Sequence, residues 1–259
     1  MNKTQLINEL KSRGFSEFIL KAFEKIKREN FIPENLKLFA YNNEPLSIAN
    51  GATISQPYTI AFMLNLLELN ELTTNNERLL SDINNYKLVT DKTNKQGSYN
   101  WYKKFLPSKN QKLINNKIKM LDKREGLKIL EIGSGSGYVL ALINKILKSL
   151  KIKYYEIYGI ERIKELAEGS KKIFEKNKKI IIIRKDGSKG LPEKKPFDRI
   201  LISAAFEKVP EHLFGQLKEN GVLVTPVRNS IFQFKKIKGK IKSKEFPGFI
   251  FVPVIEDNK

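Results

Sequence analysis

A glycine-rich loop is the part of the chain whose residues and spacing most clearly indicate a chemical use. The apolar stretch Leu127–Ile132 is expected to be a buried strand, and it leads into glycines at positions 133, 135 and 137 before an expected helix. Glycines let the backbone turn tightly and come close to a ligand. Dinucleotide enzymes share such loops, so the loop alone indicates only a nucleotide-like ligand. The pattern GxxxxGK[ST] is missing from the sequence, which excludes a P-loop.

Acidic residues at successive expected strand ends narrow the choice of ligand. Glu131 would lie under the loop, where a carboxylate repels a pyrophosphate and attracts a cation. Glu161 ends the second strand, where a carboxylate accepts hydrogen bonds from ribose hydroxyls, and Asp186 with Gly187 follows the third, within reach of an adenine edge. Together they outline one crevice for a cationic nucleoside such as a methyl sulfonium donor. The alternative is that each acid only caps a helix or a turn.

The composition removes several classes of enzyme. None of the 259 residues is cysteine, which excludes disulfides, thiolate zinc sites, iron–sulfur clusters and cysteine nucleophiles. His212 is the only histidine, so a site with several histidine ligands is excluded and we expect no metal. Its position at an expected helix start favours a surface or capping role. The net charge of +20 attracts polyanions but does not determine a fold.

Signals for membrane insertion and export are missing from the sequence. The longest strictly aliphatic stretch is Ile180–Ile183, far short of the about 20 residues that a membrane-spanning helix needs. Residues 1–14 lack the apolar segment of a signal peptide. We therefore expect a cytoplasmic monomer that has no membrane partner.

Residues 127–227 alternate between apolar strands and amphipathic helices. This order predicts a doubly wound α/β fold of the Rossmann-like class, with a mostly parallel sheet and helices on both faces. The expected strands are 127–132, 154–160, 180–184, 197–203 and 222–227. The expected helices are 138–150, 164–175 and 211–217.

The other regions flank or interrupt this cofactor-binding core, and we expect one domain over residues 1–259. Residues 1–56 show two helical patterns and form an N-terminal, substrate-side segment, followed by a helix that starts near Pro57. Residues 71–125 are rich in asparagine and poor in apolar residues, which predicts a partly helical or flexible insertion without a core of its own. Residues 228–259 are expected to add antiparallel strands at 231–237 and 249–254, joined by a Lys/Gly turn.

Further segments follow one another in the order of a known family. They are Glu44–Ile48, Thr53–Tyr58, Leu130–Tyr138, Ile160–Ile163, Asp186–Gly187, Gly190–Pro192, Pro196–Asp198, Ser203–Ala205, Val209–Pro210, Gln216–Leu217 and Phe251–Pro253. Over roughly 200 of its 259 residues the chain thus resembles the protein-L-isoaspartate O-methyltransferases. The Thr-Ile-Ser-Gln-Pro part is the most specific, because ordinary methyltransferases lack it.

The resemblance implies that S-adenosylmethionine is the cofactor and that its methyl group goes to the α-carboxyl of L-isoaspartyl residues in damaged proteins or peptides, as in protein repair. The acceptor is already ionised at neutral pH, so no strong base is required. Ser55 is the implied catalytic residue, a hydrogen-bond donor to the acceptor; the alternative is that it only caps the next helix. The implied cofactor-binding residues are Thr53, Ile54, Ser55, Glu131, Gly133, Ser134, Gly135, Gly137, Glu161, Arg162, Asp186 and Gly187. The implied substrate-binding residues are Ser55, Val252, Pro253 and Val254.

The chain departs from the family pattern at several positions. Ala49 and Lys185 stand where glycine is usual, Arg228–Ser230 replaces a glycine-containing loop, and 71–125 replaces a short connector. These changes leave open a relative that methylates aspartyl groups of a dedicated peptide or another carboxylate, and a cofactor-binding module without catalysis. The charge leaves open a basic nucleic-acid-binding methyltransferase-like protein. Against that class, the Asn/Asp-Pro-Pro-Tyr motif of amino-methyltransferases is missing after the fourth expected strand.

Overall fold

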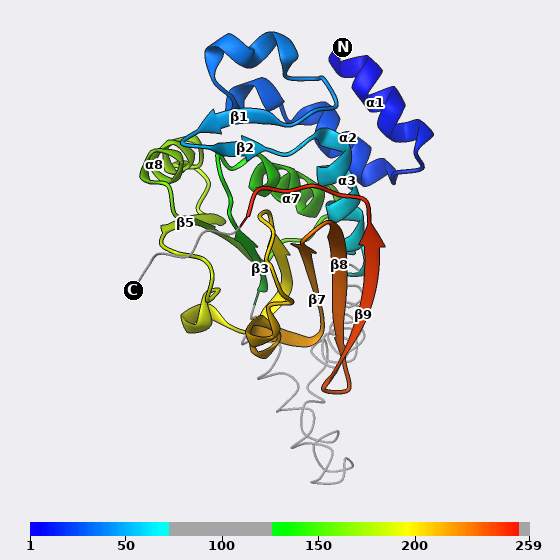
Figure 1. The fold of residues 1–259 in the computed structure, drawn as a ribbon, viewed down its shortest axis with the longest axis vertical. Helices are drawn as coiled ribbons and strands as arrows, with labels where there is room; N and C mark the ends of the chain where they lie inside the picture. Colours follow the sequence, from blue (N-terminus) through cyan, green and yellow to red (C-terminus); the bar gives the residue numbers. More distant parts are fainter. Residues whose placement is uncertain (73–125, 254–259) are drawn as a thin grey trace, which may run out of the picture. The chain divides into compact units, whose positions relative to one another are not determined.

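A mostly parallel seven-stranded sheet forms the centre of the structure (Figure 1). The computed structural model describes residues 1–72 and 126–253. The strands of this sheet are β3 (Leu127–Ile132), β4 (Tyr155–Glu161), β5 (Ile180–Arg184), β6 (Phe197–Ile202), β7 (Leu217–Val227), β8 (Ser230–Ile237) and β9 (Lys240–Pro247). Their order is β5-β4-β3-β6-β7-β8-β9; the pairs from β5 to β7 are parallel, and β8 and β9 are added antiparallel. The predicted α/β class is therefore confirmed.

Helices and a small hairpin complete the described part of the fold. The helices are α1 (Lys3–Ser12), α2 (Glu17–Lys25), α3 (Pro57–Leu66), α7 (Tyr138–Ser149) and α8 (Lys164–Ile173), with 3-10 turns η1 (Arg28–Phe31), η2 (Glu34–Phe39), η3 (Pro192–Lys194) and η4 (Glu211–Gln216). The hairpin consists of β1 (Leu46–Ala49) and β2 (Ala52–Ile54). None of the described helices is long and apolar enough to cross a membrane.

Local sequence explains where the helices begin. α1 starts at a capping box in which Asn2 and Gln5 each bond the other's backbone N–H. α3 has Pro57 in its first turn, where a missing N–H costs nothing. The expected helices at the N-terminus and after Pro57 are confirmed, whereas residues 46–54 form a hairpin that the periodicity did not indicate.

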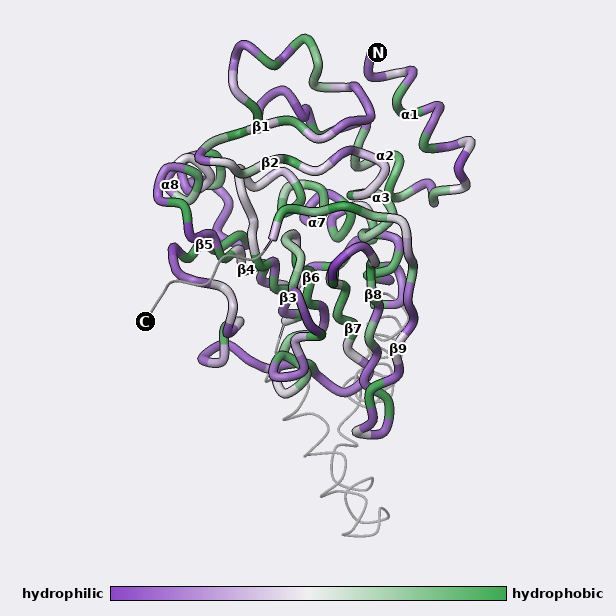
Figure 2. Tube along the Cα trace, viewed as in Figure 1, coloured by the Kyte–Doolittle hydropathy of each residue, from purple (hydrophilic) through white to green (hydrophobic). Residues whose placement is uncertain are grey.

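The two faces of the sheet are covered differently. On one face α7 approaches so closely that a Cβ added at Gly159 would lie 2.6 Å from the Leu140 side chain. The other face carries an apolar cluster in which strand residues such as Ile132 and Ile200 join Leu213 of η4. Figure 2 shows hydrophobic residues concentrated along β6 and β7, while β9 is largely hydrophilic. The core therefore lies at the parallel strands, and β9 forms an exposed flank.

Two expected elements were wrong. The expected helix at 211–217 is only the 3-10 turn η4, and β7 already starts at Leu217. The expected strand at 249–254 is not formed at its described residues, where the only pairing is a bridge between Ala205 and Pro253. The strand that pairs with β8 is instead β9, most of whose residues are exposed. A strand whose backbone pairs with one neighbour while both faces meet water needs no apolar run, so its sequence carries little signal.

The chain divides into two compact units, residues 1–69 with 127–259 and residues 70–126. Of the second unit, only residues 70–72 and 126 are described. The insertion predicted at 71–125 thus falls almost wholly outside the described residues. It stays a prediction, as does the expectation of one domain.

A buried guanidinium holds the N-terminal part of the first unit together. Arg28 of η1 is fully inaccessible to solvent, and it donates hydrogen bonds to the carbonyls of Ala40, Asn42, Glu44 and Ser55 at 2.9–3.3 Å. Within the part of the chain that the structure describes, it forms no ion pair. Burial lowers the pKa of Arg28 to about 10, so the group stays charged at neutral pH. One charged side chain therefore satisfies carbonyls from two separate segments of the chain, residues 40–44 and Ser55.

We expect Arg28→Met to lower the free energy of unfolding by about 2–4 kcal/mol, because several buried carbonyls lose their donor at once. Urea denaturation followed by circular dichroism measures the change. Arg184→Met removes an exposed guanidinium and is the matched control, with an expected effect below about 0.5 kcal/mol. Equal losses in both variants would show that Arg28 does not hold these segments.

Candidate functional site

The register of the parallel strands brings three polar groups to one end of the sheet. Glu131 of β3 lies beside Gly159 of β4 and Leu201 of β6. Ser203 directly follows β6, and its N–H donates to the carbonyl of Ile132 at 2.9 Å. The Ser203 hydroxyl therefore reaches the Glu131 carboxylate and donates to its Oε1 at 2.8 Å. Glu161, the last residue of β4, lies at the same edge.

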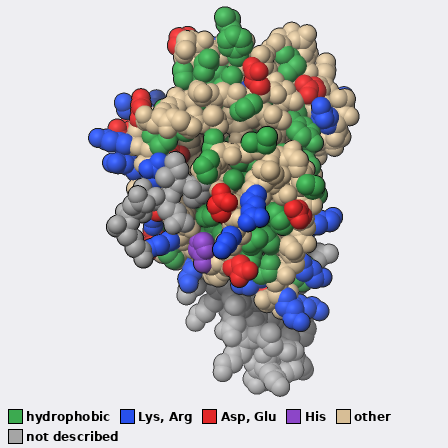
Figure 3. Space-filling view, viewed as in Figure 1, with side chains coloured by type: hydrophobic (Ala, Val, Ile, Leu, Met, Phe, Trp, Pro, Cys, Tyr) green, Lys and Arg blue, Asp and Glu red, His purple; other side chains and the backbone are tan. Residues whose placement is uncertain are grey.

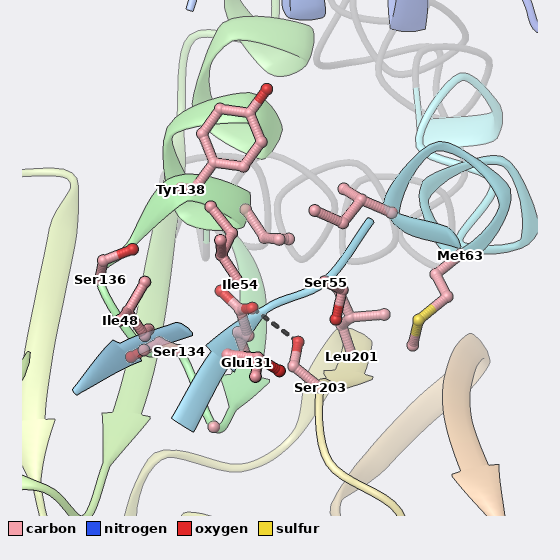
Figure 4. Close-up of a pocket in the computed structure, with 15 residues that line it drawn as sticks. Ile48, Ile54, Ser55, Met63, Glu131, Ser134, Ser136, Tyr138, Leu201 and Ser203 are labelled. Atoms are coloured by element: carbon pink, nitrogen blue, oxygen red, sulfur yellow. Dashed lines mark hydrogen bonds between the residues drawn. The ribbon is translucent and has the colours of Figure 1, made fainter. Parts of the chain in front are cut away.

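A cavity of about 490 Å³, partly open to solvent, lies above this edge (Figure 4). Polar groups reach it from Ser55, Glu131 and Ser203, which Figure 4 shows facing one space from three separate segments. Apolar side chains form much of the remaining wall, among them Ile48, Ile54, Met63, Val139 and Leu201. Among the described residues that line the cavity, none is Lys, Arg or His.

The Glu131 carboxylate is an uncompensated acid inside this cavity. It is 1 % exposed, and its Oε2 has no hydrogen-bond partner among the described residues. Burial raises the pKa of Glu131 to about 8; the Ser203 hydroxyl opposes this shift and the charge of Glu161 adds to it. The carboxyl is thus largely protonated at neutral pH until a cation offsets the cost of ionising it.

The glycine loop lies along one side of the cavity. The N–H groups of Gly133 and Ser134 donate to the Ile160 carbonyl at 2.9 and 3.0 Å, which brings the loop across onto β4. Gly137 caps α7 with φ of +90°, and a Cβ there would lie 2.6 Å from Phe174, so only glycine fits. The buried Ser134 hydroxyl oxygen, like Oε2 of Glu131, has no partner within the described residues.

Ser55 lies between β2 and α3, at the acceptor side proposed from the sequence. It lines the cavity, and its carbonyl accepts a hydrogen bond from Arg28 at 3.1 Å. The alternative that Ser55 caps α3 is wrong. The N-cap residue is Gln56, and its side chain makes no capping hydrogen bond. The Tyr58 N–H in the first turn donates instead to the Asn43 side chain. The Ser55 hydroxyl is therefore not used as a helix cap.

Seven of the twelve residues proposed for the cofactor line this cavity. They are Thr53, Ile54, Ser55, Glu131, Gly133, Ser134 and Gly135. Gly137 supports the loop from the start of α7. The roles of these residues toward the cofactor are proposals, which are argued below.

The remaining cofactor candidates lie outside the cavity wall. Glu161 accepts hydrogen bonds from the backbone N–H groups of Gly135 and Ile163, each at 2.8 Å, and so holds the loop. The Asp186 carboxylate accepts hydrogen bonds from the N–H and the hydroxyl of Ser188. Arg162 is exposed.

Gly187 has a packing requirement of its own. A Cβ added there would lie 2.6 Å from the Ile132 side chain. Close contact between β3 and the loop after β5 thus explains this glycine without reference to a ligand.

The proposed substrate residues at the C-terminal end are placed only in part. The Val252 carbonyl accepts a hydrogen bond from the Ala205 N–H at 2.8 Å, and Pro253 is bridged to Ala205. The Val252 carbonyl is thus already used inside the protein, close to the loop that bears Ser203. Val254 lies outside the described residues.

Sequence reasoning gave no role to several residues that the structure places at the cavity. Ser203 is the most important. The sequence showed that it follows an expected strand, but only the structure shows that this strand, β6, lies beside β3. Ile48 and Met63 carried no such signal, because their place in the wall depends on how the hairpin and α3 fold over the sheet. His212 stays outside; its ring lies 2.7 Å from the Ser188 carbonyl.

Solved structures of similar fold include two that align over nearly the whole chain. A protein-L-isoaspartate O-methyltransferase matches with a TM-score of 0.69 and 23% identity, covering 98% of this chain and 66% of that one. A β-aspartate methyltransferase from Plasmodium falciparum, solved with S-adenosyl-L-homocysteine, matches with a TM-score of 0.67 and 22% identity over 99% of this chain and 100% of its own. At these identities the likeness supports the fold.

Sequence comparisons also establish the family. A protein-L-isoaspartate O-methyltransferase of Petrotoga mobilis is 36% identical over 256 residues, which are 95% of this chain and 92% of the relative. A protein of the same name from Methanococcoides burtonii is 30% identical over 96% of this chain and 98% of its own. The model of the family described as protein-L-isoaspartate(D-aspartate) O-methyltransferase matches residues 1–80 and 108–259. With most of its length matched in this way, the chain belongs to that family.

Proposed function

We propose that this protein transfers a methyl group from S-adenosylmethionine to the α-carboxyl of L-isoaspartyl residues in damaged proteins and peptides. One observation carries the proposal: a cavity that holds an uncompensated carboxylate, Glu131, also receives the Thr53–Ser55 segment, which the family resemblance places at the acceptor. The substrates are proteins or peptides that contain isoaspartyl residues.

The residues at the cavity fit a cationic nucleoside cofactor. Glu131 Oε2 and the Ser134 hydroxyl are buried polar atoms for which the described residues offer no partner, and an unpaired buried polar group is costly unless a ligand satisfies it. A cationic amino group beside Glu131 favours the ionised carboxylate. The glycines of the loop give such a ligand close access to the backbone. When bound, S-adenosylmethionine supplies the sulfonium methyl group.

Ser55 orients the acceptor in this proposal. An isoaspartyl α-carboxylate is ionised at neutral pH and acts as the nucleophile without a general base. The Ser55 hydroxyl donates a hydrogen bond to one carboxylate oxygen and leaves the other free to attack. Arg28 holds the Ser55 backbone from behind, so the donor keeps its position. Catalysis of this kind depends on alignment of the reacting atoms.

The apolar wall of the cavity supports the same reaction. Ile48, Ile54, Met63 and Leu201 surround the polar groups and limit access of water. The reaction joins an anion and a cation into neutral products, so an environment with little water strengthens their attraction. The proposed catalytic contribution of the protein is thus positioning and exclusion of water.

The proposal includes a cytoplasmic, monomeric enzyme, because the cell's own ageing proteins are its substrates. Light scattering behind a size-exclusion column measures the mass, and fractionation of cells that produce the protein measures its location. A dimer or a protein recovered outside the cytoplasm would contradict this part alone.

Labelled S-adenosylmethionine offered with an isoaspartyl peptide, its aspartyl twin, transfer RNA and duplex DNA tests the function. We expect base-labile label on the isoaspartyl peptide only, because a methyl ester is hydrolysed by mild base. Label on the aspartyl peptide would indicate a diverged member of the family that methylates aspartyl groups. Label on nucleic acid would overturn the proposal.

On the face in Figure 3, basic side chains lie in several separate places, which is an arrangement that does not favour a nucleic-acid site.

We expect Ser55→Ala to lower kcat about 100-fold, the usual effect of losing one donor aimed at a reacting group. Binding of S-adenosylhomocysteine, measured by calorimetry, should persist, which shows that the variant is folded. Ser243→Ala removes an exposed hydroxyl from β9 and is the matched control. Unchanged turnover of Ser55→Ala would remove Ser55 from the proposed role.

We expect the affinity for S-adenosylhomocysteine to rise with pH between about 5.5 and 7.5, below the titration of the ligand's own amino group. The ionised Glu131 binds the cationic end of the ligand, and its raised pKa means that a proton must leave first. Calorimetry in buffers of different ionisation enthalpy measures that proton. Glu131→Gln should bind more weakly and lose the pH dependence; a dependence that persists in this variant would exclude Glu131 as its source.

Stability should change with pH in the opposite direction. In the ligand-free protein Glu131 holds its proton up to about pH 8, whereas in the unfolded chain it releases it near its ordinary value of 4.5. The folded state therefore binds more protons between these values, and its stability falls as the pH rises through this window. Melting temperatures of wild type and Glu131→Gln at pH 5 and pH 8 check the sign, since the variant should lack this contribution.

A further inference from the structure

An open groove of about 730 Å³, partly continuous with solvent, lies beside the N-terminus of α3. Four aromatic side chains line it: Tyr58 and Phe62 from α3, Phe246 from β9, and Phe249 from the segment after β9. All four rings are half-buried, so each keeps surface in contact with water. A contiguous set of partly exposed rings typically marks a binding surface.

The rings form a connected and fixed set. Phe62 packs on Phe249 with centroids 5.1 Å apart and on Phe246 at 5.4 Å, and Tyr58 stacks parallel to Phe249 at 6.4 Å. The Asn229 carbonyl accepts hydrogen bonds from the N–H groups of Gly248 and Phe249, both at 3.0 Å, which fixes the turn after β9. Because the walls are already in place, a ligand side chain does not have to order them.

The groove is next to the proposed acceptor site. Ser55 lines the cavity that contains Glu131, and the following residue, Gln56, lines the groove. Neighbouring Cα atoms are about 3.8 Å apart, and an extended peptide advances about 3.3 Å per residue. A peptide whose isoaspartyl carboxyl meets Ser55 therefore has a side chain one or two residues away within reach of the groove.

Two charged side chains lie at or beside the groove. The Arg13 guanidinium lies over the Tyr58 ring, 4.8 Å from its centroid. Glu245 lines the groove but is exposed, and it accepts a hydrogen bond from Ser230. Because four of the eight lining residues are aromatic and Glu245 is the only charged one, the groove suits an apolar side chain of a peptide.

We propose that this aromatic groove is a specificity subsite for an apolar or aromatic side chain of the substrate, one or two residues from the isoaspartyl residue. The inference rests on the proposed function, which supplies the peptide. Three observations carry it: the connected rings, their fixed backbone, and the step of one residue from Ser55 to Gln56. It assigns Phe62 and Phe249 a role in the choice of substrate, not in the transfer step.

A set of isoaspartyl peptides in a Gly/Ser background tests the subsite. Phenylalanine is placed in turn at each of the two positions before and the two positions after the isoaspartyl residue, and kcat/KM is compared with that of the parent. We expect one position to raise kcat/KM about tenfold in the wild type, as burial of a phenylalanine side chain allows. A lysine at that position should give no such gain.

Two variants connect the preference to the groove. Phe249→Ala removes a ring from the turn after β9, and Phe62→Ala removes one from α3, so a folding defect in one does not prevent the test. We expect the ratio of kcat/KM for the phenylalanine and parent peptides to fall below about threefold in both. Phe39→Ala, at an exposed ring on η2 outside the groove, is the matched control and should keep the wild-type ratio. Calorimetry with S-adenosylhomocysteine verifies folding.

Each outcome decides one question. If no position of phenylalanine improves the wild-type reaction, or if the gain survives in both groove variants, the subsite is wrong. If wild-type protein self-associates and Phe249→Ala abolishes that association while peptide preference is missing, the groove joins two copies of the chain, and the proposal is also wrong. If the wild type methylates none of the isoaspartyl peptides, the proposed function itself fails, which is a separate result.

Discussion

A buried carboxylate that has no cationic partner is the constraint on which the candidate site depends. Glu131 is fixed by the pairing of β3 with both of its neighbours, so it cannot move to water without breaking the centre of the sheet. Among the described residues, only Ser203 donates a hydrogen bond to its carboxylate, and Oε2 has no partner. Such a group lowers the stability of the free protein, and it contributes favourably only when a cation binds beside it. The position of Glu131 in the sheet thus favours a positively charged ligand.

Arg28 has the corresponding role, with the opposite sign, on the side proposed for the acceptor. It too is buried without an ion pair in the described chain, but its two terminal nitrogens donate to backbone carbonyls that solvate the charge, and only its Nε has no partner among the described residues. Its bond to Ser55 ties the proposed acceptor segment to η1. The hairpin β1–β2 places Ile48 over the glycine loop, 3.3 Å from where a Cβ of Gly135 would be. The N-terminal segment is therefore held in place by one guanidinium and closes one side of the cavity.

The sequence predicted the parallel strands closely, because a strand buried on both faces is a nearly continuous apolar run, as in the buried residues 222–227 of β7. The prediction from sequence was wrong at β9, because its exposed lysines are typical of a loop. It was also wrong at Phe249, whose apolar neighbours are typical of a strand although its ring lines the groove. The cavity was predicted at Glu131 and the glycine loop, where motif and chain order coincide. Ser203 received no role, because its importance comes from strand order, β3 beside β6, which is a long-range property.

Glu161 shows how holding the loop and binding a ligand are compatible in one side chain. Its oxygens accept hydrogen bonds from the N–H groups of Gly135 and Ile163, so it fixes the loop at the end of β4 before any ligand arrives. A carboxylate offers about four lone-pair positions, and two backbone bonds leave capacity for the ribose hydroxyls proposed as its partners. The loop and the acid that are proposed to meet the ligand are therefore positioned by the same hydrogen bond. A change at Glu161 would disturb both, whereas a change at Ser203 would remove a hydrogen bond to Glu131 and a hydroxyl from the cavity wall.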